Sequence, residues 1–76
     1  MPKLPRNLPG AELIKILSQE GFVKKRQKGS HVILIKEDEG GKRGCVVPMH
    51  SALKVGTLKA ILKQAGIGEE EFLKLL

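Results

Sequence analysis

Apolar residues recur at helical spacing near both ends of the chain, with a strand-like region between them. The first apolar stretch predicts a helix with Asn7 or Leu8 near its N-cap, Pro9 in its first turn and Gly21 as its C-terminal stop. The apolar face of this helix is expected to consist of Leu13, Ile14, Leu17 and Ala11.

The middle of the chain has the turn residues and alternation of three short strands. Phe22 to Lys28 is predicted to form the first strand, His31 to Lys36 the second and Gly44 to Pro48 the third. Gly29-Ser30 is a two-residue turn whose leading glycine suits a type II′ hairpin. Glu37 to Lys42 is expected to form a longer, charged turn before the third strand.

Two more helices are predicted in the C-terminal part. One runs from about Lys54 or Gly56 to Ala65, and a short one follows from Glu69 to Leu76. The order is α-β-β-β-α with a short C-terminal helix, which indicates an α+β fold with a three-stranded antiparallel sheet and helices on one face. No repeat or linker interrupts the chain, so residues 1–76 are predicted to form a single domain.

The register of the first hairpin predicts which side chains share a face of the sheet. With Gly29 and Ser30 as the turn, the pairs on one face are Lys28 with His31, Arg26 with Ile33 and Lys24 with Ile35. Burying three cations together would be prohibitively unfavourable, so this face is predicted to be the open one. The opposite face then carries Val23, Lys25, Gln27, Val32, Leu34 and Lys36, of which the two valines and the leucine are expected in the core.

Two isoleucines remain on the predicted open face. Ile33 and Ile35 are apolar residues next to one another on a face without helices. An exposed apolar patch of this kind indicates a surface for a protein partner.

The net charge of the chain indicates which kind of ligand it binds. Fourteen Lys and Arg against eight Asp and Glu give a net charge of +6. Binding of a polyanion and a merely solubilising cationic surface explain this charge about equally well. Clustering favours a polyanion, because many cations fall in predicted neighbouring strands and turns: Lys24, Lys25, Arg26, Lys28, Lys42 and Arg43. Phe22 and Phe72 are the only aromatic residues, so recognition of RNA by stacked rings is not expected.

Gly29-Ser30-His31 places one imidazole directly after the densest basic run. Imidazole exchanges a proton near neutral pH, and neighbouring cations hold a polyanion, which together satisfy the needs of metal-free RNA cleavage. A histidine beside a turn is more often simply solvated, so the pattern alone favours that interpretation over catalysis. His50 is interpreted as a loop residue whose ring bonds the backbone, in preference to a second acid–base group.

The sequence gives little support for a metal site, a serine nucleophile or a nucleotide-binding loop. His31, His50 and Cys45 match no standard zinc spacing, so no metal and no small-molecule cofactor is expected. No serine lies in a nucleophile-elbow motif, and no glycine-rich loop leads from a strand into a helix. Cys45 is expected to be a small buried hydrophobe. The lack of a signal peptide or a long apolar run predicts a cytoplasmic protein without a membrane partner.

A series of short segments spans nearly the whole chain: Leu4-Pro5, Gly10-Ala11-Glu12-Leu13, Gly21-Phe22, Gln27-Lys28-Gly29-Ser30-His31, Val47-Pro48-Met49-His50, Gly56 to Ile67 and Glu71-Phe72-Leu73. In this order and spacing they resemble HicA, the small toxin of HicA–HicB toxin–antitoxin pairs. The resemblance implies a fold like the double-stranded RNA-binding domain, cleavage of mRNA independently of the ribosome, and inhibition by a HicB-like antitoxin that masks the active site. In this family the histidine of the Gly-Ser-His turn is catalytic, and His31 stands at that position. The segment from Glu37 to Arg43 looks longer and more charged than the usual form.

The predicted function is therefore that of a toxin and metal-independent endoribonuclease with His31 as its catalytic residue. The predicted RNA-binding residues are Lys24, Arg26, Lys28, Ser30, Lys42 and Arg43, and the predicted antitoxin contacts are Ile33 and Ile35. A non-catalytic RNA-binding module would explain the charge equally, and a protein-interaction subunit would explain the exposed isoleucines. Both alternatives stay open at this point.

Overall fold

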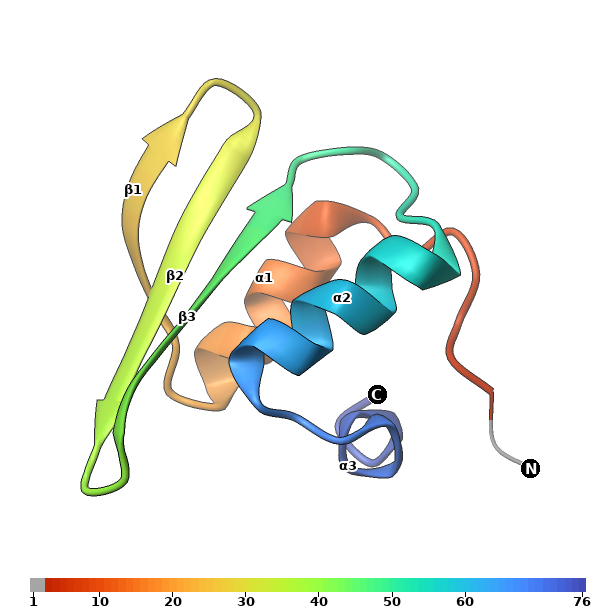
Figure 1. Ribbon diagram of the computed structural model, residues 1–76. Helices are drawn as coiled ribbons and strands as arrows, with labels where there is room; N and C mark the ends of the chain where they lie inside the picture. Colours follow the sequence, from red (N-terminus) through yellow and green to blue (C-terminus); the bar gives the residue numbers. More distant parts are fainter. Residues whose placement is uncertain (1–2) are drawn as a thin grey trace.

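The structure is a computed structural model that describes residues 3–76. The predicted domain also includes residues 1–2, which lie outside the described part. The three strands form an antiparallel sheet in the order β1-β2-β3, and the helices lie on one side of it (Figure 1). In chain order the elements are α1 (Gly10–Gln19), β1 (Val23–Lys28), β2 (His31–Asp38), β3 (Gly41–Pro48), α2 (Val55–Ala65) and α3 (Glu69–Leu73). The predicted α+β fold and element order are confirmed.

The core lies between the helices and the two strands β2 and β3. Alternate residues of these strands point toward the helices and are buried: Val32, Leu34, Cys45 and Val47. The helices meet them with Leu13, Leu17, Leu58, Ile61, Leu62 and Ala65. Full burial of one such leucine stabilises the fold by about 1.5–3 kcal/mol. Ile14 is half-buried, whereas Ala11 is exposed, so its predicted place on the apolar face is wrong.

The ends of the helices agree with prediction to within a few residues. Pro9 is the N-cap of α1 and not part of its first turn, and its carbonyl oxygen accepts the N–H groups of Glu12 and Leu13 at 3.1 Å. The last helix ends at Leu73, three residues earlier than predicted. These differences of one to three residues are common at helix ends, where the first and last turns lack intrahelical partners.

The helices pack on β3 and β2 and do not cover β1. Every residue of β1 is exposed, and Figure 1 shows this strand at the edge of the sheet farthest from α2. The predicted burial of Val23 is therefore wrong, since its side chain is 55% exposed. Val23 pairs with Ile35 and not with Lys36, so it lies on the face of the sheet that the helices do not cover. Both faces of β1 can consequently carry charge without a desolvation penalty.

A β-bulge changes the register halfway along the first hairpin. Lys28 pairs with His31 and Arg26 with Ile33 as predicted, but the register shifts between Lys24 and Arg26. As a result Lys24 lies opposite Leu34, and the predicted pair of Lys24 with Ile35 is wrong. A bulge inserts one extra residue into one strand, so the residues before it change face.

The second hairpin is tighter than predicted. β2 and β3 remain paired out to Asp38 and Gly41, so Glu39 and Gly40 alone form the turn. The Asp38 side chain accepts a hydrogen bond from the Gly40 N–H at 2.8 Å, and Lys42 lies 4.0 Å from the Glu37 carboxylate. The expected long charged turn is wrong because these charged residues continue the ladder as cross-strand neighbours.

Candidate active site at the first hairpin

His31 is the first residue of β2 and follows directly on a tight turn. Gly29 has φ +61°, whereas Ser30 has no positive φ, the combination that the predicted type II′ turn requires. A Cβ atom at Gly29 would have no neighbour within 4 Å, so the tip of the turn is open. The side chain of His31 is exposed. The turn therefore presents its imidazole to solvent.

Three cations lie on the same face of the sheet as His31. Lys28 is directly opposite His31, and Arg26 is opposite Ile33. Lys25 lines a shallow hollow with Ile35 and Glu37, which lie on the face of the sheet away from the helices. Lys25 and Arg26 are consecutive residues on one face, as a bulge allows. The open face consequently combines one imidazole with Lys25, Arg26 and Lys28.

Lys24 lies on the opposite face of the first hairpin. Its Nζ donates a hydrogen bond to Oε1 of Gln27 at 2.9 Å, and Gln27 pairs with the core residue Val32. Gln27 in turn donates from Nε2 to the carbonyl oxygen of Gly29 at 3.1 Å. The prediction that Lys24 shares a face with His31 is wrong, because the bulge turns it over. Lys24 instead supports the turn through Gln27.

The sequence offered no signal for this exchange of Lys24 and Lys25. The bulged segment is a run of Lys and Arg without glycine, so strict alternation was the natural expectation. The bulge is evident only from the pairing of β1 with β2.

Lys42 and Arg43 lie at the other end of the sheet. Lys42 is opposite Glu37, six residues along β2 from His31, a separation of about 20 Å at the rise of a strand. Arg43 faces the helices and covers Gly66, where a Cβ atom would lie 3.3 Å from its Nη1. The structure does not bring either side chain to His31. Their contact with RNA stays a prediction, and it would belong to a separate surface.

An apolar strip crosses the open face beside the cations. Ile33 and Ile35 are half-buried and lie opposite Val46 and Val23, which are 39% and 55% exposed. The partner surface predicted from two isoleucines thus includes two valines as well. These four side chains form what we term the open-face strip.

The loop after β3 is hydrogen-bonded to the turn that precedes His31. The N–H of Met49 donates to the carbonyl oxygen of Ser30 at 2.6 Å. The carbonyl oxygen of His50 accepts the N–H of Gly10 at 2.9 Å. The predicted hydrogen bond of the His50 ring is absent among the described residues, and this ring is exposed. His50 thus contacts its surroundings through the backbone.

Other candidate groups do not join this site. Burial raises the pKa of the Cys45 thiol to about 11, so the reactive thiolate does not form near neutral pH. Within residues 3–76, no three His, Cys, Asp or Glu side chains gather as a group that could hold a metal ion. In the same part of the chain, no helix has the length and apolar character needed to cross a bilayer.

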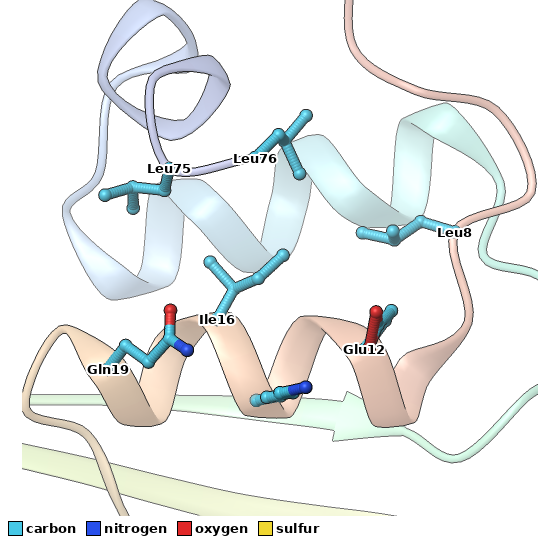
Figure 2. A pocket seen from close by; sticks show the side chains of 7 residues that line it. Leu8, Glu12, Ile16, Gln19, Leu75 and Leu76 are labelled. Atoms are coloured by element: carbon cyan, nitrogen blue, oxygen red, sulfur yellow. The ribbon is translucent and has the colours of Figure 1, made fainter.

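An apolar hollow lies on the side of α1 away from the sheet. Figure 2 shows Ile16 pointing into it, with Glu12 and Gln19 on either side of Ile16 along α1 and with Leu8 and Leu76 across from them. It shares no residue with the surroundings of His31. The hollow therefore has no part in the candidate active site.

The chain matches a known protein family. A family model described as the HicA toxin of bacterial toxin–antitoxin systems matches residues 10–67. The matched range runs from the first residue of α1 past the end of α2 and includes the whole sheet. No match was found among curated proteins.

Proposed function

Because the chain belongs to the HicA family of toxins from bacterial toxin–antitoxin systems, we propose that it is an endoribonuclease with His31 as its catalytic residue. The match covers the Gly-Ser-His turn together with the sheet that carries it. A toxin of this family has a cognate antitoxin as its partner. The observation that carries the proposal is the exposed imidazole of His31 on the face that also holds Lys25, Arg26 and Lys28.

In the proposed reaction an RNA 2′-hydroxyl attacks the adjacent phosphorus. A bond forms between the 2′-oxygen and phosphorus, the bond from phosphorus to the 5′-oxygen breaks, and a 2′,3′-cyclic phosphate and a 5′-hydroxyl result. Neutral His31 takes the proton of the 2′-hydroxyl, or protonated His31 gives a proton to the leaving 5′-oxygen, and water exchanges the second proton. One positioned acid–base group of this kind accelerates a reaction by about 10²–10⁴-fold.

The cations have a separate task in this mechanism. Lys28 lies next to His31 across the turn, and Arg26 follows at the next position on the same face. Arginine can hold two phosphate oxygens at once through its planar guanidinium group. We assign these residues and Lys25 to binding the RNA backbone and stabilising negative charge on the phosphate oxygens in the transition state.

The open-face strip is the proposed contact for the antitoxin. Its apolar side chains begin two residues after His31 and lie between exposed polar and charged neighbours. Exposed apolar patches with a polar rim are typical of protein interfaces. An antitoxin on this strip would cover His31 and keep RNA from the cations, which explains how binding could inhibit cleavage.

The proposal is tested by purified protein, RNA and a metal chelator. His31→Ala should lower the rate of RNA cleavage by at least about 100-fold, because the imidazole that exchanges the proton is lost. Binding of RNA and its dependence on salt should remain. His50→Ala is the matched control, since it removes the other exposed imidazole of the described residues, and its cleavage rate should equal that of the parent.

Two results would contradict the assignment. Retained cleavage by His31→Ala would remove His31 from the mechanism. RNA binding without any cleavage by the parent would leave a non-catalytic RNA-binding module.

A further inference from the structure

The first residue of α1 lies against the loop that holds the His31 turn. Gly10 donates its N–H to the carbonyl oxygen of His50, and Met49 of the same loop donates to the carbonyl oxygen of Ser30. Ser30 directly precedes His31 in the chain. Two backbone hydrogen bonds thus connect the start of a helix, through the loop, to the residue beside the imidazole.

Gly10 leaves no room for a side chain at this contact. A Cβ atom would overlap the carbonyl oxygen of Pro48 and would lie 3.2 Å from its carbonyl carbon and 3.3 Å from the Cα of Met49. These neighbours are backbone atoms, which cannot rotate away as a flexible side chain would. Any larger residue must therefore separate α1 from the loop.

The displaced loop is the immediate neighbour of His31. Pro48 is paired with His31 across β2 and β3, and Met49 is bonded to Ser30. The cations Lys25, Arg26 and Lys28 lie on β1, on the opposite side of β2, and make no contact of this kind with the loop. A shift of the loop would move the imidazole relative to Lys25 and Arg26, which lie farther from the turn along β1.

We infer that Gly10 is a positioning residue for His31: the close approach of α1 to the loop sets where the imidazole stands relative to the RNA phosphate held by β1. The inference rests on the proposed function for its consequence in catalysis. Displacement of a reacting group by about 1 Å can lower a rate by about 100-fold. Phosphate binding by exposed cations tolerates such a shift, because electrostatic attraction changes slowly with distance.

Gly10→Ala tests the inference, with Gly56→Ala as its control. Gly56 is also in the first turn of a helix, but a Cβ atom there would have no neighbour within 4 Å. Gly10→Ala should lower kcat for RNA cleavage about 10- to 100-fold with KM nearly unchanged. Gly56→Ala should leave both constants as in the parent.

Amide and imidazole NMR signals provide a readout independent of cleavage. In Gly10→Ala the amides of Ser30 and Met49 and the ring of His31 should shift, while those of β1 at Lys25 should not. Absence of these shifts would overturn the inference, even if the parent proved inactive and the proposed function failed. Unchanged kcat in an active background would also overturn it, as would an equal loss of RNA affinity in Gly10→Ala.

Native-state hydrogen exchange of the parent protein covers the case in which Gly10→Ala does not fold. If the contact acts as a unit, the amides of Gly10 and Met49 open with the same free energy. Much faster exchange at Met49 than at Gly10 would show that the turn is not held through α1.

Discussion

The two hairpins at the ends of β2 resemble one another in outline and differ in what surrounds their charges. Each has a two-residue turn, Gly29-Ser30 in the first and Glu39-Gly40 in the second. The first turn is flanked by Arg26 and Lys28, which have no acidic cross-strand neighbour, whereas Lys25 farther along β1 lines a hollow together with Glu37. In the second, Glu37 and Lys42 form an ion pair, the only one within residues 3–76. The positive charge beside the first turn is therefore available to a ligand, whereas the charge at the second turn is largely compensated.

The hairpins also differ in how their turns are held. The carbonyl oxygens of Gly29 and Ser30 accept hydrogen bonds from Gln27 and Met49, which come from two sides. The second turn is closed by its own residues through the bond of Asp38 to Gly40, and Figure 1 shows it at the end of the sheet away from the first turn. A precisely placed catalytic group requires support from the surrounding structure. Of the two turns, the first has that support.

The largest expected difference between the two hairpins is in how much a substitution weakens binding of the antitoxin. Ile33→Asp places a charge in the middle of the open-face strip and should weaken antitoxin binding by at least about 30-fold, the range of an interface hot spot. Lys42→Asp, at the second hairpin, should change the affinity little. Isothermal titration calorimetry with the purified antitoxin measures both, and thermal unfolding by circular dichroism verifies the fold. Equal affinities for Ile33→Asp and the parent would place the antitoxin elsewhere.

RNA affinity should show a smaller difference, which also tests the bulge. Lys25→Ala should weaken RNA binding about fourfold near 0.15 M salt and reduce the slope of log K against log salt by about 0.7, as the loss of one phosphate contact predicts for single strands. Lys24→Ala and Lys42→Ala should each have a weaker effect. Fluorescence anisotropy with a labelled RNA over a range of salt gives these slopes. A larger effect of Lys24→Ala than of Lys25→Ala would contradict the assignment of faces.

The smallest expected effect is a change in the stability of the protein on substitution at the second hairpin. Glu37→Gln removes the exposed ion pair with Lys42 and should change the free energy of unfolding by less than about 1 kcal/mol. RNA cleavage should be unaffected. Urea unfolding followed by circular dichroism, together with the cleavage assay, measures both. Loss of cleavage in this variant would show that the two hairpins are coupled.

Local patterns were sufficient for most of the fold. The spacing of Leu13 and Leu17, the glycines that end the helices and the alternation in β2 all predicted elements that the structure contains. Such signals work because helix ends, tight turns and strand periodicity depend on residues close together in the chain. The second turn was misjudged because charged residues there are cross-strand partners, which only the pairing reveals.

The candidate site could be predicted in part. The position of His31 beside its turn follows from the sequence, since glycine at the first central position of a type II′ turn is a local requirement. The role of Gly10 has a faint signal in the sequence, namely a poor helix former at the start of a helix. Its partner at Pro48 lies 38 positions away, and no local pattern connects the two.

By itself the sequence determined the order of the elements, the Gly29-Ser30 turn and the placement of His31 next to the basic run. Only the tertiary structure decided which cations share the face of His31, that β1 stays uncovered by the helices, and that the turn is joined to α1 through the loop after β3. The physical reason is that the conformation of a turn depends on residues adjacent in the chain. The face of the sheet on which a side chain lies, and the close contact of a helix with a loop, depend instead on how distant segments pair and pack.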